Sequence, residues 1–413
     1  MTYKRRFLGG KIKALMAMFS SVAVIGPRQC GKSTLVKNLF PEWKYYDLER
    51  PDDYQLITTD PLAFFSRNPD RVIIDEAQQY PQLFSVLRSV IDEDRETTGR
   101  FLLTGSSSPV IVKGLSESLA GRIATVELWP LKMAELYQQE MPNIYDMITN
   151  AETVLADFAG LETGITHEQL YDHWLLGGYP EPRIKGQDNP LFHKVWMDSY
   201  FTDFIHRDIQ RLFPRINTHN FRKMIQTLSF HSGNILNQST IATSLELSSV
   251  TIKEYLDILH DTFIWRNLTS FDKNPLKKFQ KMPKGHFRDS GTLHQLLKLD
   301  NVDDLMIHPV AGKSFESFTI EEIIRGFQST VQTNIDFNFY RTKDKAEIDL
   351  IVDGPFGFIP IEIKLGTKIN QRMLISLKSF IKDTHSRFGI LVNNAARIEV
   401  IADDIIQIPA IYF

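Results

Sequence analysis

The stretch Val22-Ala-Val-Ile-Gly-Pro-Arg-Gln-Cys-Gly-Lys-Ser33 decides the fold of the N-terminal part of this chain. Its last eight residues match the pattern G-x-x-x-x-G-K-[ST] in full. The apolar run Val22–Ile25 before the pattern predicts a strand, and Thr34–Phe40 after it predicts a helix. A glycine loop between a strand and a helix surrounds an anion with backbone N–H groups and with the positive end of the helix dipole. The stretch therefore predicts a phosphate-binding loop.

The residue types in the loop point to a nucleoside triphosphate. Lys32 is expected to reach the β- and γ-phosphates, and the Ser33 hydroxyl is expected to ligate Mg²⁺. Neither the dinucleotide fingerprint G-x-G-x-x-G nor the kinase motif D-F-G occurs in the chain. The expected cofactors are therefore ATP and Mg²⁺. The positions expected to line the nucleotide are Gly26, Pro27, Arg28, Gln29, Cys30, Gly31, Lys32, Ser33 and Thr34.

The segment Arg71-Val-Ile-Ile-Asp-Glu76 predicts the second half of the same site. An apolar strand that ends in two acids places both carboxylates at the carboxyl edge of the sheet, facing the loop. Asp75 is expected to hold Mg²⁺, and Glu76 is expected to polarise the attacking water as general base. Two solvated acids at a strand end are the alternative. A further strand near Tyr45–Leu48 suits the ATPases that have an extra strand between the loop strand and the acidic strand.

Two more positions are candidates for the reaction itself. The predicted strand Phe101–Leu103 ends in the polar run Thr104–Ser108, where Ser106 or Thr104 is expected to sense the γ-phosphate. A plain turn with a helix N-cap is the alternative for this run. Arg122 is expected either to stabilise charge as an arginine finger, in its own chain or a neighbour, or to pair with surface acids.

Composition limits the class of protein. The chain has 413 residues, 43% of them apolar and 23% charged, which is ordinary for soluble globular proteins. The net charge of −3 does not indicate a general nucleic-acid binder, although local basic patches remain compatible with it. A single cysteine excludes an intrachain disulfide and a cysteine-based metal cluster. The longest uncharged stretch near the start, Ala14–Pro27, is too short for a membrane span. We expect a cytoplasmic protein that makes no membrane contact.

The middle of the chain predicts a winged helix-turn-helix. Ser239–Leu245 and Val250–His260 read as helices, Ser248 as an N-cap and Phe263–Leu268 as a strand. Duplex DNA binding through the second helix is one interpretation. Its exposed side carries more acid than base, which favours a packing or lid module: Thr251, Lys253, Glu254 and Asp257. The expected buried side is formed by Ile241, Leu245, Val250, Tyr255, Leu256 and Leu259.

Three acidic positions stand out in the last part of the chain. Glu316 lies on a predicted helix, Asp349 shares a strand face with Glu347, and Glu362-Ile-Lys364 follows thirteen residues after Asp349. Because side chains alternate along a strand, Glu362 and Lys364 share one face. We expect Glu316, Asp349 and Glu362 to bind one or two Mg²⁺ or Mn²⁺ ions. Lys364 would orient or activate water for phosphodiester hydrolysis. A charged strand edge without activity is the alternative.

A basic segment with interleaved phenylalanines precedes this cluster. It predicts either phosphate contact or a solvated linker, and both readings remain open. Its basic residues are Lys273, Lys277, Lys278, Lys281, Lys284 and Arg288.

Taken together, the motifs resemble a large prokaryotic family of AAA-type ATP-binding proteins. In that family the ATPase is fused to a C-terminal domain of unknown function with winged-helix and restriction-endonuclease-like, PD-(D/E)xK, parts. The family's loop usually carries a small apolar residue where this chain has Cys30. The resemblance implies an ATPase related to regulatory, STAND-like switches. It rests on Gly26–Thr34, Val72–Gln78, Leu103–Ser107, Leu119–Arg122, Gly177–Pro180, Glu316, Glu347–Asp349 and Glu362–Lys364.

The expected organisation follows from these motifs. Residues 1–140 form an α/β P-loop ATPase domain with a parallel sheet, and 141–215 form a helical lid or connector. Residues 216–270 form the winged helix-turn-helix, and 271–413 form the restriction-endonuclease-like domain. The leading hypothesis is a Mg²⁺-dependent ATPase switch coupled to nucleic acid, with DNA as a candidate partner. The competing hypothesis is a signalling or scaffold ATPase whose inert nuclease-like domain binds a protein partner. A homo-oligomer is compatible with either.

Overall fold

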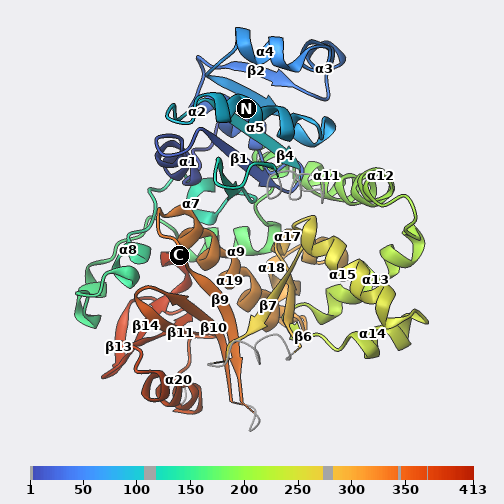
Figure 1. The fold of residues 1–413 in the computed structure, drawn as a ribbon. Coiled ribbons are helices and arrows are strands. Elements are labelled where there is room, and N and C mark those ends of the chain that lie inside the picture. Colours follow the sequence, from blue (N-terminus) through green and yellow to red (C-terminus); the bar gives the residue numbers. More distant parts are fainter. Residues whose placement is uncertain (1–2, 107–117, 273–281, 343–345, 370) are drawn as a thin grey trace. The chain divides into compact units, whose positions relative to one another are not determined.

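A five-stranded parallel sheet forms the centre of the N-terminal part of the chain (Figure 1). The order of its strands is β2-β3-β4-β1-β5, and all neighbouring pairs are parallel. This confirms the four strands predicted above and the α/β class, and β5 adds a fifth strand. The strand between β1 and β3 is β4, whereas β2 lies at the edge. The strands are β1 Ser21–Gly26, β2 Lys44–Asp47, β3 Val72–Asp75, β4 Phe101–Ser106 and β5 Ile123–Glu127.

Helices cover both faces of this sheet. Val72 and Ile74 of β3 belong to one apolar cluster, whereas Ile73 between them belongs to another on the opposite face. The first cluster includes residues of α4 and α5, and the second includes residues of α1 and α2. A strand that is apolar on both faces is typical of a parallel sheet buried between two helical layers. These helices are α1 Leu8–Met16, α2 Lys32–Leu39, α3 Pro51–Thr58, α4 Pro61–Arg67, η1 Ala77–Gln79 and α5 Leu83–Glu93.

A computed structural model describes residues 3–106, 118–272, 282–342, 346–369 and 371–413. The chain divides into two units. The first unit comprises Met1–Leu131 with the short segments Tyr179–Ile184 and Asp261–Ile264. The second unit comprises the remainder: Lys132–Gly178, Lys185–His260 and Trp265–Phe413. The main segment of the first unit thus ends at Leu131, nine residues before the boundary near 140 that the sequence suggests.

A nine-stranded mixed sheet runs through the second unit in the order β13-β14-β12-β11-β10-β9-β7-β8-β6. Strands β6, β8 and β7 are antiparallel, and β7 pairs in parallel with β9 through Thr269 and Ser270. This short pairing makes one sheet out of two parts of the chain. The strands are β6 Asn234–Ile235, β7 Trp265–Ser270, β8 Lys284–Phe287, β9 Asp336–Arg341, β10 Glu347–Gly354, β11 Gly357–Ile363, β12 Gly389–Asn393, β13 Glu399–Ala402 and β14 Ile405–Pro409.

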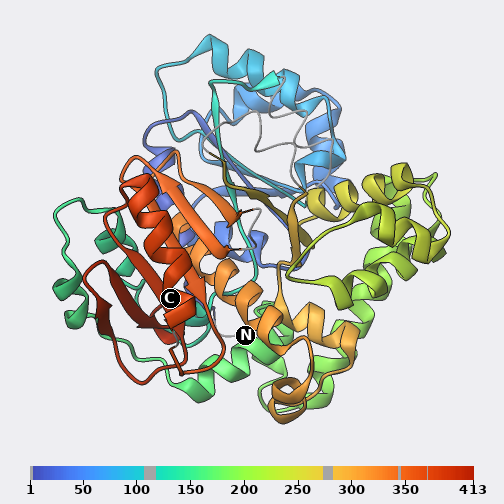
Figure 2. The same ribbon diagram turned by 90° about the horizontal axis from the view of Figure 1, so that it is seen from below.

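Two helices pack on opposite faces of the second sheet. Ile348 of β10 packs with Leu377 and Phe380 of α20, which lies across the sheet in Figure 2. The neighbouring residues Glu347 and Asp349 point to the other face, because side chains alternate along a strand. There they approach α19, a helix that is buried along almost its whole length. The bounds of the two helices are Ala311–Ser329 for α19 and Gln371–Thr384 for α20.

The remaining helices of the second unit precede the strands of this sheet along the chain, lie between them or follow them. They are α7 Met133–Leu136, α8 Ile144–Thr149, η2 Leu155–Gly160, α9 His167–Leu176, α11 Pro190–Asp203, η3 Phe204–Ile209, α12 Gln210–Leu212, α13 Thr218–His231, α14 Gln238–Leu245, α15 Ser249–Asp261, α17 Ser290–Leu297, α18 Val302–Ile307 and η4 Ala410–Tyr412. Those between 141 and 215 agree with the predicted helical connector. A further short helix, α10 Pro180–Lys185, begins in the first unit. Within the described residues, every helix is too short or too polar to cross a membrane.

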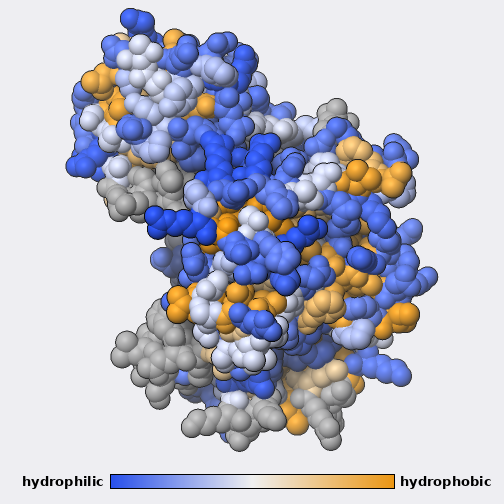
Figure 3. All heavy atoms as spheres, turned by 90° about the vertical axis from the view of Figure 1, so that its right-hand side faces the viewer, coloured by the Kyte–Doolittle hydropathy of each residue, from blue (hydrophilic) through white to orange (hydrophobic). Residues whose placement is uncertain are grey.

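The two helices predicted at 239–260 form close to their expected bounds. The Ser248 hydroxyl accepts a hydrogen bond from the Thr251 N–H at 3.0 Å, so Ser248 caps α15 as expected. The burial prediction is wrong for Val250, which is 77% exposed, and Leu245 is only half-buried. Ile252, two residues after Val250 and therefore on the other side of the helix, is buried instead, as is Ile258. Figure 3 shows the side of the molecule that carries α11–α15, where hydrophobic and hydrophilic residues are mixed.

Candidate functional site

The glycine loop joins β1 to α2 in a conformation that depends on its glycines. Gly31, the N-cap of α2, has a φ of 97°, which is in the left-handed region. A Cβ on Gly26 would lie 2.0 Å from the Leu128 carbonyl oxygen, closer than any side chain can approach. The Lys32 ammonium donates to the carbonyls of Gly26 and Pro27 at 3.1 and 2.9 Å. The loop therefore keeps its positive charge directly over its own backbone.

Asp75 ends β3 beside this loop and is only 3% exposed. Its carboxylate accepts hydrogen bonds from the hydroxyls of Tyr45 and Thr104, and the Ser33 hydroxyl contributes another. Burial raises the pKa of Asp75, while the bonds from Ser33 and Tyr45 act against that shift. The structure thus brings together the two predicted Mg²⁺ ligands, Ser33 and Asp75.

Glu76 follows in a strained backbone conformation, with a φ of 53°. Its Oε2 accepts from the Ser106 N–H at 3.3 Å and from the Ser106 hydroxyl at 3.0 Å, and the Gln78 amide is a third donor. Burial would raise the pKa of Glu76, but Lys32 and the bonds from Gln78 and Ser106 outweigh it, so the pKa lies below its usual value. Glu76 is therefore ionised and fixed in direction at neutral pH.

Ser106 thus positions Glu76 in this structure, and Thr104 holds Asp75 and accepts from the Glu76 N–H. Both residues sit at the end of β4, next to the carboxylates, where the sequence predicts a γ-phosphate sensor. The last residues of the predicted run, Ser107 and Ser108, lie outside the described residues. Gln78 and Tyr45 were not singled out from the sequence, and their contacts depend on pairing between strands that are distant along the chain.

Cys30 lies in the loop, but its side chain does not face the nucleotide position. The thiol is fully buried in the apolar cluster that includes Leu35 and Leu128, and its Sγ lies 3.5 Å from the Leu128 carbonyl oxygen. Burial raises the pKa of Cys30, and this outweighs the opposing charges of Lys32 and Arg6. Cys30 is expected to line the nucleotide, but its side chain therefore does not. Only the backbone of Cys30 remains available to a phosphate.

Arg122 lies at the amino end of the strands, opposite to the carboxyl edge where the glycine loop begins. It precedes β5, and its carbonyl accepts a hydrogen bond from Ser21, the first residue of β1. Its guanidinium binds both carboxylate oxygens of Asp92, at 2.7 and 2.9 Å. The glycine loop follows the last residue of β1, so Arg122 does not reach the nucleotide position of its own chain. Of the two predicted roles, pairing with a surface acid is the one that the structure contains.

Arg6 also contributes to the loop, and no pattern in the sequence indicated this role. Its buried guanidinium donates to the Cys30 carbonyl at 2.9 Å and to the Trp129 carbonyl. It therefore ties the glycine loop to the segment that follows β5. A lone arginine before the first helix has no motif or periodicity that would indicate such a contact.

The acidic positions of the second unit converge, but around a lysine. Lys284 of β8 is 1% exposed, and its Nζ forms ion pairs with Glu316, with Glu347 at 2.9 Å and with Asp349 at 3.4 Å. Lys313 adds a second pair to Glu316 at 2.8 Å. The predicted cluster therefore contains an ammonium group where the sequence predicts a metal ion. Glu347, rather than Glu362, completes the tight group of three acids.

Glu362 and Lys364 lie on the neighbouring strand as the alternation predicts. Lys364 Nζ is 2.6 Å from Glu362 Oε1 and 3.4 Å from Asp349 Oδ2, which also accepts from the Ile363 N–H at 2.9 Å. Burial and the adjacent Asp349 raise the pKa of Glu362 to about 8. For Asp349, burial is outweighed by Lys284 and Lys364, which lower its pKa to about 2.

Both interpretations of the basic segment before the cluster are wrong for the two basic residues that the structure describes. Lys284 is paired as above, and Arg288, 7% exposed, forms an ion pair with Glu321. Neither phosphate contact nor a solvated linker fits these two buried residues. Lys284 and His286 alternate along β8, and Arg288 follows directly after it. This spacing was the available signal for a charged face against a buried helix. Lys273, Lys277, Lys278 and Lys281 lie outside the described residues.

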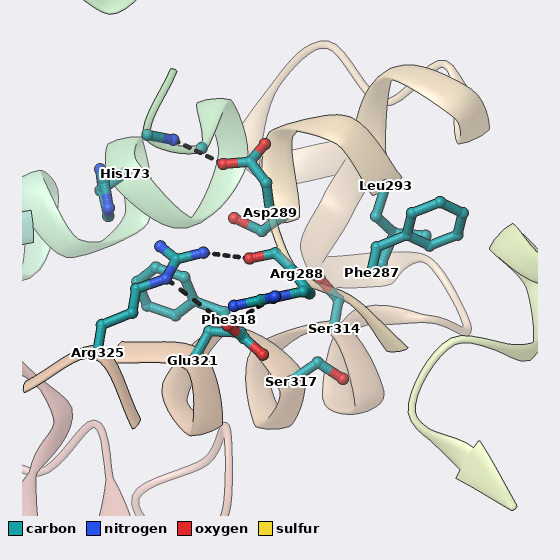
Figure 4. A pocket seen from close by; sticks show the side chains of 13 residues that line it. His173, Phe287, Arg288, Asp289, Leu293, Ser314, Ser317, Phe318, Glu321 and Arg325 are labelled. Carbon is teal, nitrogen blue, oxygen red and sulfur yellow. Dashed lines mark hydrogen bonds and ion pairs between the residues drawn. The ribbon is translucent and has the colours of Figure 1, made fainter. Parts of the chain in front are cut away.

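A second buried charge centre surrounds Glu321 of α19 (Figure 4). It accepts from Arg266 at 3.1 Å and from His286 at 2.9 Å, and Arg288 and Arg325 lie at 3.7 and 3.6 Å. Burial would raise the pKa of Glu321, but Arg266, His286 and Arg288 hold it well below its usual value. This network connects α19 to β7 and β8.

A small pocket lies beside this network, lined among others by His173, Arg288 and Arg325. Its volume of about 10 Å³ is close to the space that a single water occupies. On its rim Asp289 accepts from the Gly178 N–H at 2.9 Å, as the dashed line in Figure 4 shows. A Cβ on Gly177 would lie 2.5 Å from the Asp289 carboxylate, which explains the glycine at this position. The pocket suits a buried water better than a substrate.

Comparison with protein families divides the chain into three matched regions. Residues 19–137 match an AAA domain, and they therefore form an AAA-type ATPase domain. Residues 167–303 match a domain of unknown function (DUF8612), and residues 311–411 match another (DUF4143). The AAA match contains the glycine loop, Asp75 and Glu76. The acids of the cluster all lie in the third matched region, and Lys284 lies in the second.

Similar whole proteins occur in mycobacteria. The uncharacterized protein Rv2008c of Mycobacterium tuberculosis is 31% identical over 417 residues, which cover 99% of this chain and 84% of that protein. The uncharacterized protein Mb2031c of Mycobacterium bovis gives the same values.

Solved structures are more distant. The Walker-type ATPase PABY2304 of Pyrococcus abyssi has a TM-score of 0.46 and 14% identity, covering 72% of this chain and 96% of that chain. The Aeropyrum pernix ORC1 protein in complex with DNA has a TM-score of 0.31 and 12% identity, covering 74% and 95%. Both TM-scores are below 0.5 and carry no information on function.

Proposed function

Because this chain belongs to the family of the two mycobacterial proteins and contains an AAA-type ATPase domain, we propose that it is a Mg²⁺-dependent ATP hydrolase that works as a molecular switch. One observation carries this proposal: Lys32, Ser33, Asp75 and Glu76 meet at the carboxyl edge of one parallel sheet. A cation, a hydroxyl and two carboxylates in this arrangement are the groups that phosphoryl transfer requires.

The oxygen donors of the site fit a hard divalent cation. Ser33 and Asp75 are in contact, and hydroxyl and carboxylate oxygens are the ligands that Mg²⁺ prefers. Bound with ATP, Mg²⁺ would neutralise charge on the phosphates. Lys32 would exchange the carbonyls of Gly26 and Pro27 for phosphate oxygens. Glu76, held by Ser106, would accept the proton of the attacking water.

Replacing Lys32 by alanine tests this proposal. Hydrogen bonds to charged groups contribute about 1.5–3 kcal/mol, so the Kd for ATP is expected to rise at least ~10-fold. Titration calorimetry with Mg-ATP measures the change. Lys44→Ala, which removes an exposed lysine that donates to Asn68 at 2.7 Å, is the matched control and should bind ATP normally. Unchanged binding by Lys32→Ala would contradict the assignment of the loop.

We further propose that the switch acts with nucleic acid through the second unit. The order α13–β6–α14–α15–β7–β8, with its small antiparallel sheet, supports a winged helix-turn-helix. The convergence of Glu316, Asp349, Glu362 and Lys364 supports a nuclease-like centre. A non-cleaving scaffold that binds a protein partner remains the alternative, and the acidic exposed side of α15 favours it: Lys253, Glu254 and Asp257.

A cleavage assay separates these two functions. The full chain is incubated with ATP, Mn²⁺ or Mg²⁺ and single- or double-stranded DNA or RNA. A nuclease centre predicts cleavage that requires the metal and disappears in Asp349→Asn, because that carboxylate is central to the cluster. The absence of cleavage by both the wild-type chain and Lys284→Ala would leave the scaffold function.

A further inference from the structure

The ammonium of Lys284 occupies the centre of the acidic cluster. Its three partner carboxylates come from α19 and β10, and the lysine itself comes from β8. One oxygen from each of Glu316, Glu347 and Asp349 lies within 4.8 Å of the other two. Oxygens at this spacing can surround a single small cation, since Mg²⁺–oxygen distances are about 2.1 Å. The same space cannot hold both a divalent ion and this ammonium.

The cluster is close to electrically neutral without a metal. Four carboxyl groups face three lysines: Glu316, Glu347, Asp349 and Glu362 against Lys284, Lys313 and Lys364. Each of the three ammonium groups forms an ion pair with at least one of these carboxylates. A buried cluster with balanced charges has little need of an added cation. Removal of Lys284 alone would unbalance it.

One polar atom indicates that the cluster has remaining capacity for a ligand. Glu362 is 7% exposed, and its Oε2 has no hydrogen-bond partner among the described residues. Its other oxygen is held by Lys364, which also contacts Asp349, so the carboxyl group lies next to the cluster. A buried carboxylate oxygen without a partner is costly unless it is protonated or binds a cation.

We propose that Lys284 is the resident cation of this cluster and that a divalent metal binds there only when the Lys284 side chain is withdrawn. This inference rests on the proposed nuclease-like centre and does not depend on the ATPase. Among the described residues, Lys284 is the one contribution of β8 to the cluster, so withdrawal of this single side chain would free the carboxylates that it pairs. The lysine is then an internal inhibitor of metal binding.

Manganese titration of the full chain without nucleotide tests the inference. Lys284→Ala is expected to bind Mn²⁺ at least 10-fold more tightly than the wild type, as measured by calorimetry. Mn²⁺ should also raise the melting temperature of this variant but leave that of the wild type unchanged, because ligands stabilise only the state that they bind. Lys284→Gln, which keeps most of the side-chain length without charge, provides the same comparison if the alanine variant does not fold.

Two control variants make the result specific to the site. Lys313→Ala removes another lysine that pairs with Glu316, but the Lys313 side chain is partly exposed and does not occupy the centre of the cluster. This variant should not gain Mn²⁺ binding. Lys284→Ala combined with Asp349→Asn should lose the gained binding. Equal Mn²⁺ affinity in the wild type and Lys284→Ala would overturn the proposal, and so would the absence of binding in both Lys284 variants. ATP hydrolysis by the same preparations shows whether the ATPase proposal stands independently.

Discussion

Replacing Glu76 by glutamine is expected to lower the rate of ATP hydrolysis at least ~100-fold, since a positioned general base contributes about 10²–10⁴ in rate. The amide cannot accept the proton of the attacking water. Its oxygen can still accept the hydrogen bonds that Ser106 donates at 3.0 and 3.3 Å, so the side chain should keep its position. ATP binding should remain, because Lys32 and Ser33 are unchanged.

Phosphate release measured at saturating Mg-ATP, together with nucleotide titration, checks both halves of this expectation. Glu93→Gln is the matched control, because Glu93 is an exposed acid at the end of α5. It should leave both hydrolysis and binding unchanged. An unaltered rate in Glu76→Gln would place the base elsewhere. Loss of ATP binding would instead show that Glu76 shapes the loop rather than the reaction.

The sequence predicted the first unit well because its signals are local. The run Val72–Ile74 is apolar on both faces and ends in two acids, and a parallel strand between helical layers produces that pattern. The loop Gly26–Ser33 has a fixed spacing for a physical reason, since Gly31 needs a left-handed φ and Gly26 leaves no space for a Cβ. Ser33 and Asp75 meet because parallel strands bring their carboxyl ends to one edge.

The errors concern partners that are distant along the chain. Lys284 appeared as part of a basic surface segment, but its partners Glu316 and Asp349 lie 32 and 65 residues later. Cys30 was assigned to the phosphate side of its loop, and its actual direction depends on packing against Leu128. Only the tertiary fold fixes such directions. The alternating charges of β8 were the available signal. They are equally compatible with burial against an acidic helix and with a phosphate contact.

The free energy of unfolding of the second unit should fall by about 3–5 kcal/mol in Glu321→Gln, because removing one partner leaves buried charges uncompensated. Arg266, Arg288 and Arg325 all direct their guanidinium groups to this carboxylate, and His286 shares it. The glutamine oxygen can still accept one hydrogen bond, so the loss reports mainly on charge. It should be seen in the unfolding transition that belongs to the second unit, since a chain of two units need not unfold in one step.

Asp92→Asn is the control for this loss, because it breaks an equally close arginine–carboxylate pair at the surface. Solvent and salt screen an exposed pair, so this variant should unfold at the same temperature as the wild type. The contrast decides what Glu321 does. If both variants behave alike, Glu321 is dispensable, and the attachment of α19 to β7 and β8 depends on apolar packing. If only Glu321→Gln is destabilised, the buried carboxylate holds α19 against β8, the strand that carries Lys284 into the acidic cluster.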